Sequence, residues 1–125
     1  MPVAVDSSNE RENTDKAAAI SAAIEHMWVR FLPQTRARVQ ILESAALALE
    51  RGTLTPDECE AAAGAAHKLA GTLGTFNLAR GTVVARELEQ LYGSGKLPSP
   101  EIAAQLASEL REMIEGRSGG QGNRI

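Results

Sequence analysis

Apolar residues recur at intervals of three and four along most of the chain, which is the spacing of one face of an α-helix. The first such pattern covers about residues 15–30, and Pro33 then ends or kinks it. A second pattern covers 34–51 and stops at Gly52, and the two together are also compatible with one long kinked helix. The apolar stripes of these patterns are Ile20, Ile24, Met27 and Phe31, followed by Val39, Leu42, Ala46 and Leu49.

Turn signals separate three further helical patterns. The motif "TPDE" starts the third, because Thr55 suits an N-cap, Pro56 suits the first turn and Glu58 completes a capping box. We expect this helix to run to about residue 73 and to be closed by Gly74 in the left-handed conformation. The fourth pattern covers about 78–92, and "GSG" breaks it. The fifth starts at Ser99 or the following proline and runs to about residue 114.

The fold class follows from these patterns. No stretch has the two-residue alternation of a β-strand, and a chain of 125 residues fits one domain with a single core. Amphipathic helices joined by short connections pack most simply as an up-and-down bundle. We therefore expect an all-α bundle at 15–115, with flexible polar tails at 1–14 and 116–125.

Composition narrows the class of partner. A net charge of -3 provides no basic field for a phosphate backbone, which argues against nucleic acid. No apolar run approaches the length that spans a bilayer, and the N-terminus lacks the pattern of a signal peptide. A single cysteine cannot form an internal disulfide. We therefore expect a cytoplasmic protein without membrane contact, and a monomer, because the apolar seams suffice for one bundle.

One of the two histidines lies in an unusually small neighbourhood. On the third helix an apolar seam should face the core, and His67 lies about 120° from its centre, toward solvent. Small residues dominate the positions three, four and seven away, and glycine inside a helix costs about 0.5–1 kcal/mol. The seam is Cys59, Ala62, Ala66, Leu69 and Leu73, and the small neighbours of His67 are Ala63, Gly64, Ala70, Gly71 and Gly74.

Two interpretations of this neighbourhood stay open. The small face can pack closely against another helix, with His67 at its edge. Alternatively, it clears a space in which a partner reaches His67, and the charged flanks Glu60 and Lys68 favour this second interpretation. Glu87 and Glu89 on the next helix are interpreted as a solvated face, and His26 as a partly buried histidine without companion metal ligands.

The segment "AAHKLAGTLGTFNLARGTVVARELEQL" resembles the phosphoacceptor region of histidine-containing phosphotransfer (HPt) domains, which act in two-component phosphorelays. "MWVRFLPQTRARV" is also similar to the N-terminal region of such domains. The resemblance implies a four-helix bundle with an additional N-terminal helix, and it implies that His67 is the phosphoacceptor. Many members carry lysine three residues after the histidine, whereas this chain has Ala70 there and Lys68 directly after the histidine.

The resemblance also implies a mechanism. His67 would accept a phosphoryl group from a receiver-domain phospho-aspartate and pass it to another response-regulator receiver, with Lys68 supporting the phosphoryl group. The receivers, among them those of a hybrid sensor kinase, would supply Mg²⁺. The chain itself has no nucleotide-binding loop and no carboxylate cluster beside His67, so we expect a phosphocarrier without a metal or cofactor rather than an enzyme. The alternative is a degenerate HPt-like bundle that acts only as a protein-interaction module.

Overall fold

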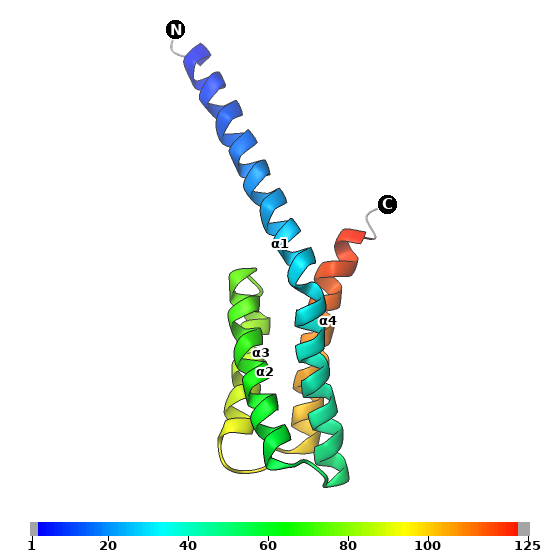
Figure 1. Cartoon of the computed structure of the whole chain (residues 1–125). Helices are drawn as coiled ribbons and strands as arrows, with labels where there is room; N and C mark the ends of the chain where they lie inside the picture. Colours follow the sequence, from blue (N-terminus) through cyan, green and yellow to red (C-terminus); the bar gives the residue numbers. More distant parts are fainter. Residues whose placement is uncertain (1–2, 123–125) are drawn as a thin grey trace. The chain divides into compact units, whose positions relative to one another are not determined.

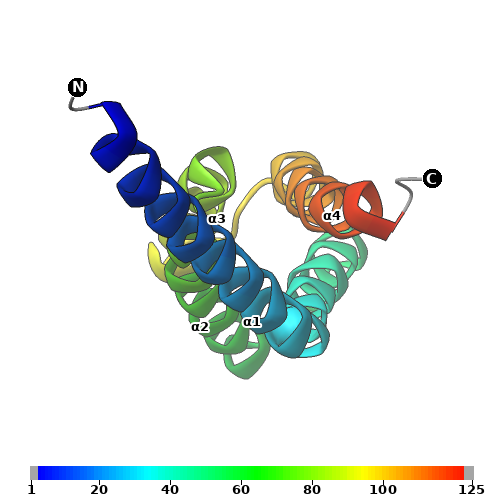
Figure 2. The same cartoon turned by 90° about the horizontal axis from the view of Figure 1, so that it is seen from above.

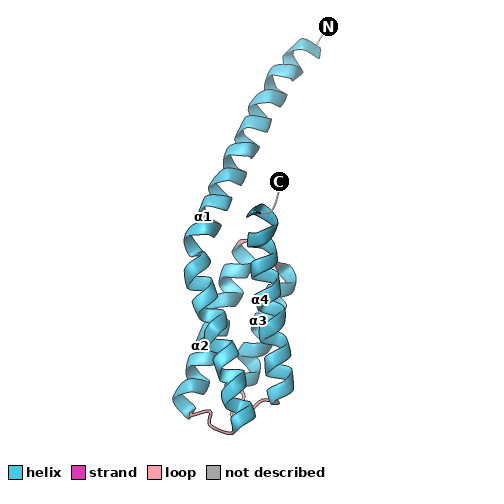
Figure 3. Cartoon of the chain, turned by 90° about the vertical axis from the view of Figure 1, so that its right-hand side faces the viewer, coloured by secondary structure: helices cyan, strands magenta, loops and turns pink. Residues whose placement is uncertain are grey.

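The computed structural model describes the backbone of residues 3–122 and the side chains of 10–118. Within this part every regular element is helical, which confirms the all-α prediction (Figure 3). The helices are α1 (Val3–Arg51), α2 (Pro56–Thr75), α3 (Ala79–Gly93) and α4 (Pro100–Gly122).

The chain divides after Leu32 into two compact units, residues 1–32 and residues 33–125. The second unit is the helical bundle. Its α2 and α3 lie side by side, and the 33–51 part of α1 runs beside α4 (Figure 1). Seen from above, these four segments surround a common interior (Figure 2).

The core of the bundle consists of the apolar stripes of its four helices. On α1 the predicted stripe of Val39, Leu42, Ala46 and Leu49 is buried, as predicted. The other helices contribute Leu and Val side chains together with many alanines, whose small size lets the helices approach closely. These residues are Ala62, Ala65, Ala66, Leu69, Ala70, Leu73, Val84, Ala85, Leu88, Ala103, Leu106, Ala107, Leu110 and Ile114.

Charged pairs join the 33–51 part of α1 to α4 at the edge of this core. Arg111 donates to the carboxylate of Glu43 with an Nη2–Oε1 distance of 2.7 Å, and Arg36 donates to Glu115 with an Nη2–Oε1 distance of 2.6 Å. A hydrogen bond from Arg36 and, to a smaller extent, one from Arg111 lower the pKa of the Glu115 carboxyl. Exposed pairs of this kind add at most about 1 kcal/mol each, so burial of the apolar stripes remains the main stabilising force.

The start of α2 confirms the predicted capping box. The Thr55 hydroxyl accepts from the backbone N–H of Glu58 at 3.1 Å, and the Glu58 carboxylate accepts from the backbone N–H of Thr55 at 2.9 Å. This second hydrogen bond is the main cause of the lowered pKa of Glu58. Gly52 also ends α1 as predicted, with a φ of 70° that favours glycine.

The end of α2 differs from the prediction. The helix continues through Gly74 to Thr75, and Asn77 is the residue with left-handed backbone, at a φ of 60°. Asparagine tolerates this conformation better than most residues other than glycine, so it can end a helix in the same way. The prediction that Gly74 closes the helix was wrong.

The helices are also longer than the apolar patterns indicated. α1 is one helix that begins at Val3 and passes through Pro33, and α4 continues to Gly122. Residues 3–14 and 116–122 are therefore helical, although their sequences lack an apolar stripe. An apolar stripe predicts a helix only where one face of that helix is apolar. Helical segments without such a face cannot be predicted from it.

The first predicted stripe belongs to the first unit, and its side chains are exposed. Ile20 is 60% exposed, Ile24 40%, Met27 41% and Phe31 43%, whereas Trp28 is fully buried. His26, expected to be partly buried, is exposed as well. Helical periodicity identified an amphipathic helix here but did not identify which face would be buried.

Candidate functional site

His67 lies midway along α2 and projects away from the bundle core. Its neighbours Ala66 and Leu69 are fully buried, which anchors that face of the helix and turns position 67 outward. The His67 side chain is 73% exposed. The imidazole is therefore open to a large partner, as the helical geometry predicted.

Glu89 on α3 holds the imidazole ring. The distance between His67 Nδ1 and Glu89 Oε2 is 2.8 Å, within hydrogen-bond range. The preceding residue, Leu88, is fully buried and anchors α3 at this level. Sequence reasoning missed this pair because it interpreted Glu89 as part of a solvated face, and the relative register of two helices is not visible in either helix alone.

The hydrogen bond determines the chemistry of the ring. A neutral imidazole carries one proton, and a carboxylate at Nδ1 favours the form in which Nδ1–H donates to it. The other ring nitrogen of His67, Nε2, then has a free lone pair. An exposed Nε2 with a lone pair is a competent nucleophile.

The glycines around His67 leave open space. A Cβ atom added at Gly64 or Gly71 would have no atom within 4 Å, apart from the adjoining residues and the backbone of its own helix. A Cβ at Gly74 would approach only the Thr82 hydroxyl, at 3.7 Å. Gly64 and Gly71 lie about 40–60° around the helix from His67, on one side of its ring. We call these two positions the glycine clearing.

Two other predicted site residues occupy different positions. Ala70 is only 4% exposed, so it belongs to the core side of α2 and lies on the other side of His67 from the glycine clearing. The prediction that Ala70 belongs to the surface cleared for a partner was therefore wrong. Its neighbours Leu69 and Leu73 are buried, and they turn that side of the helix toward the core. Lys68 is exposed, about 100° around the helix from His67 and on the same side as the glycine clearing.

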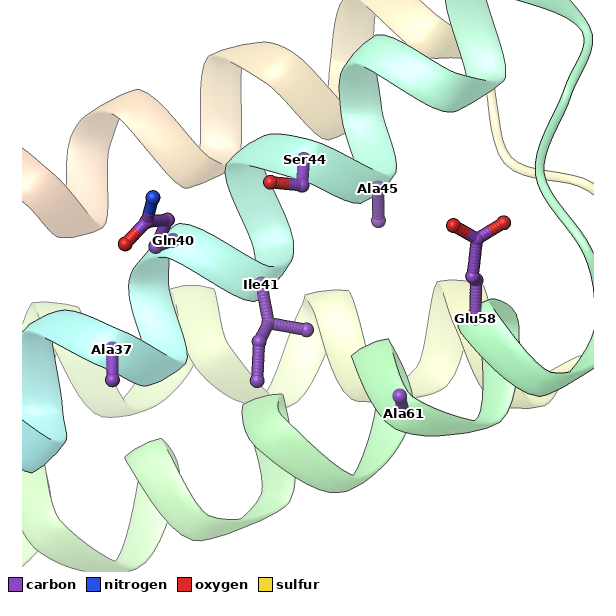
Figure 4. A pocket seen from close by; sticks show the side chains of 7 residues that line it. All are labelled: Ala37, Gln40, Ile41, Ser44, Ala45, Glu58 and Ala61. Atoms are coloured by element: carbon purple, nitrogen blue, oxygen red, sulfur yellow. The ribbon is translucent and has the colours of Figure 1, made fainter.

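A groove lies between the 33–51 part of α1 and the first turns of α2. It encloses about 280 Å³, and Ile41 points across it from α1 toward α2 (Figure 4). Ala61 on α2 lines the groove, and Gly64 of the glycine clearing follows it one helical turn later. The full lining is Ala37, Gln40, Ile41, Ser44, Ala45, Glu58 and Ala61.

Other chemistry is limited in the described part of the chain. On α3, the Arg80 guanidinium pairs with the Glu109 carboxylate at 3.2 Å, and Arg86 is exposed. Among the described residues no three His, Cys, Asp or Glu side chains are grouped as metal ligands would be. None of the described helices combines the length and the apolar character that crossing a membrane requires.

Comparison with known proteins relates this site to a family. A family model described as "Hpt domain" matches residues 26–118, which include all of α2 and α3. The chain is similar to Protein RcaC of Microchaete diplosiphon, with 34% identity over 90 residues. The match covers 72% of this chain and 14% of that protein, so the chain spans about one seventh of the relative's length. No solved structure matches.

Proposed function

Because the chain belongs to the Hpt domain family, we propose that it is a phosphorelay intermediate whose phosphoacceptor is His67. The observation that carries the proposal is the exposed imidazole with Nδ1 bound to Glu89 at 2.8 Å. This geometry supports a nucleophilic Nε2 on a surface that a protein partner can reach.

The proposed reaction is an in-line phosphoryl transfer. The His67 Nε2 lone pair forms a bond to the phosphorus of a receiver phospho-aspartate, while the bond from phosphorus to the aspartate oxygen breaks. The aspartate leaves as a carboxylate, and a second receiver takes the phosphoryl group by the reverse step. Such transfer depends mainly on positioning and charge stabilisation, so the carrier needs little chemistry of its own.

Glu89 would serve as a positioning residue in this reaction. It would orient the His67 ring and favour the tautomer with the proton on Nδ1. When Nε2 bonds to phosphorus, the ring gains positive charge, and a carboxylate at 2.8 Å stabilises that charge. The receiver would bring Mg²⁺ to the phosphoryl oxygens, in agreement with the exposed position of His67.

The receiver would dock over the glycine clearing and the neighbouring groove. Gly64 and Gly71 give its loops access to the ring, and Ile41 offers an apolar contact one helix away. Lys68 lies on the same side, and its flexible stem can bring the ammonium group toward the phosphoryl oxygens.

The test is incubation with a phosphorylated receiver and Mg²⁺, followed by detection of label on this chain. We expect label on the wild type and none on His67→Gln. His26→Gln is the matched control, because His26 is the other histidine and is also exposed, and it should retain the label.

Two results would contradict the proposal. Equal labelling of His67→Gln would place the phosphoryl group elsewhere. A wild-type chain that binds receivers but never carries label would instead be a protein-interaction module.

A further inference from the structure

A second groove lies on the side of the bundle that does not carry His67. It runs between the 33–51 part of α1 and α4 and encloses about 340 Å³. The 33–51 part of α1 lies beside α2 and α4, and α3 contacts both α2 and α4, so the α1–α4 side is opposite the α2–α3 side (Figure 2). His67 and Glu89 lie on the α2–α3 side. We call the second groove the α1–α4 groove, and a partner bound there would leave the imidazole free.

The α1–α4 groove has a small, apolar base. Ala46 on α1 and Ala107 on α4 are buried, and Leu47 is 51% exposed. Alanine leaves room for a large apolar side chain of a partner, and Leu47 would be covered in the same contact. The full lining is Glu43, Ala46, Leu47, Glu50, Ala104, Ala107, Ser108, Arg111 and Glu112.

The charged residues of this lining are mainly acidic. Arg111 donates to Glu43 at 2.7 Å and to Glu115 at 3.3 Å, so its positive charge is already compensated within the chain. Glu50 and Glu112 are exposed, and neither forms an ion pair with any residue whose side chain the structure describes. The groove therefore combines an apolar base with unpaired carboxylates.

This combination favours one class of partner. A phosphate backbone or an anionic membrane would meet the carboxylates with charge of the same sign. A second copy of this chain that used the same groove would bring two sets of glutamates together, and such like-charge contacts are unfavourable. A protein segment with an apolar side chain between lysines or arginines would instead bury that side chain against Leu47 and place its cations beside Glu50 and Glu112.

We propose that the α1–α4 groove docks a basic amphipathic segment of another protein. The apolar side chain of that segment would lie over Ala46 and Ala107, and its Lys or Arg side chains would pair with Glu50 and Glu112. The inference does not rest on phosphotransfer, because the groove is separate from His67. It implies that the chain can bind a second protein while the imidazole stays accessible.

The test uses synthetic helical peptides in which Leu, Met or Phe lies between arginines. Each has a counterpart with glutamate in place of arginine. The full chain is titrated with each peptide and followed by NMR and calorimetry. We expect a basic peptide to bind and to shift the backbone signals of Leu47, Ser108 and Glu112, whereas those of His67 and Glu89 stay unchanged. The glutamate counterparts should not bind.

Two matched pairs of variants locate the binding. Leu47 and Val83 are similarly exposed, at 51% and 48%, but Val83 lies on α3 outside the groove. Leu47→Ser should raise the dissociation constant of the basic peptide by about tenfold, and Val83→Ser should leave it unchanged. Glu112→Gln should raise it by about two- to fivefold, and Glu87→Gln, which removes an exposed carboxylate of α3, should not.

Several outcomes would overturn the proposal. They are the absence of binding by every basic peptide up to about 1 mM, equal binding of the glutamate counterparts, and shifts centred on His67. An equal effect of Leu47→Ser and Val83→Ser would overturn it as well. Circular dichroism checks the fold of the variants, whose substituted residues are all exposed. A failure of His67 labelling in the wild type would contradict the phosphorelay proposal and leave the peptide result standing.

Discussion

The glycine clearing should make folding and phosphotransfer respond in opposite directions to one substitution. In Gly71→Leu the new side chain begins in open space, because a Cβ at position 71 has nothing within 4 Å. It projects outward about 40° from His67, where a docked receiver would lie. In the isolated domain the substitution replaces glycine with a better helix former. In the complex the leucine side chain would clash with the docked receiver.

The size of each effect can be estimated. Glycine inside a helix is less favourable than alanine by about 0.8–1.0 kcal/mol, and leucine is close to alanine. We therefore expect the free energy of unfolding to rise by about 0.5–1 kcal/mol, which corresponds to a gain in Tm of roughly 2–8 °C. Displacing a reacting group by about 1 Å can slow a reaction a hundredfold, so transfer should slow by at least about tenfold.

Gly81 on α3 provides the matched control. A Cβ there would lie 3.0 Å from Leu73 Cδ1 and 3.5 Å from Met113 Sδ, and Leu73 is fully buried. Overpacking a core costs typically about 1–3 kcal/mol, which exceeds the gain in helix propensity. Gly81→Ala should therefore lower stability and leave the transfer rate of the folded protein unchanged.

Two measurements decide the question: urea unfolding for stability, and rapid-quench kinetics with a phosphorylated receiver for transfer. Transfer by Gly71→Leu at the wild-type rate would refute the idea that the receiver uses the clearing. A loss of stability in Gly71→Leu would show that position 71 is not open in the folded chain.

Two further predictions concern α3. Glu89→Ala should slow labelling of His67 by about three- to fivefold, because the pair is partly exposed and exposed pairs contribute at most about 1 kcal/mol; Glu89→Gln, which keeps an acceptor, should lie between it and the wild type in the same quench assay. Burial raises the pKa of Tyr92 from 10.0 to about 12, so the stability that this residue gives is complete below pH 10 and is lost as the pH rises toward 12. Tyr92→Phe should remove this alkaline loss in urea titrations, and an unchanged pH profile would contradict the assignment.

The most accurate predictions from the sequence concern features that depend only on residues within one or two turns of the same helix. The capping box of Thr55 and Glu58 lies within one helical turn, and it formed as expected. The outward direction of His67 follows from Leu69 and Leu73 on the same helix. Each of these features depends on backbone geometry that short-range spacing already specifies.

Features that depend on how two helices pack against each other could not be predicted from the sequence. The pairing of His67 with Glu89 depends on the register of α2 against α3, which no periodicity within one helix contains. The exposure of Ile20 was missed for a related reason: periodicity within one helix identifies an apolar face without identifying which element packs against it.

The small residues of α2 serve both roles that the sequence left open: some pack closely against another helix, and others leave space around His67. Leu73 lies against Gly81 of α3, and Gly74 faces Thr82 of α3, so α3 lies on the side of α2 that also carries Ala66 and Ala70. Both alanines are buried there, and their small size lets α3 approach closely enough for Glu89 to reach the imidazole. On the other side of the ring, Gly64 and Gly71 remain open.

Close packing and clearance are therefore properties of opposite flanks of His67. Replacing Ala70 with a larger residue should push α3 away and break the hydrogen bond to Glu89, with a loss of about 1–3 kcal/mol in stability. Replacing Gly71 should preserve that hydrogen bond. NMR of the His67 imidazole resonances in the two variants distinguishes the effects of these two sides. Equal shifts in both variants would show that the ring is not held from the α3 side.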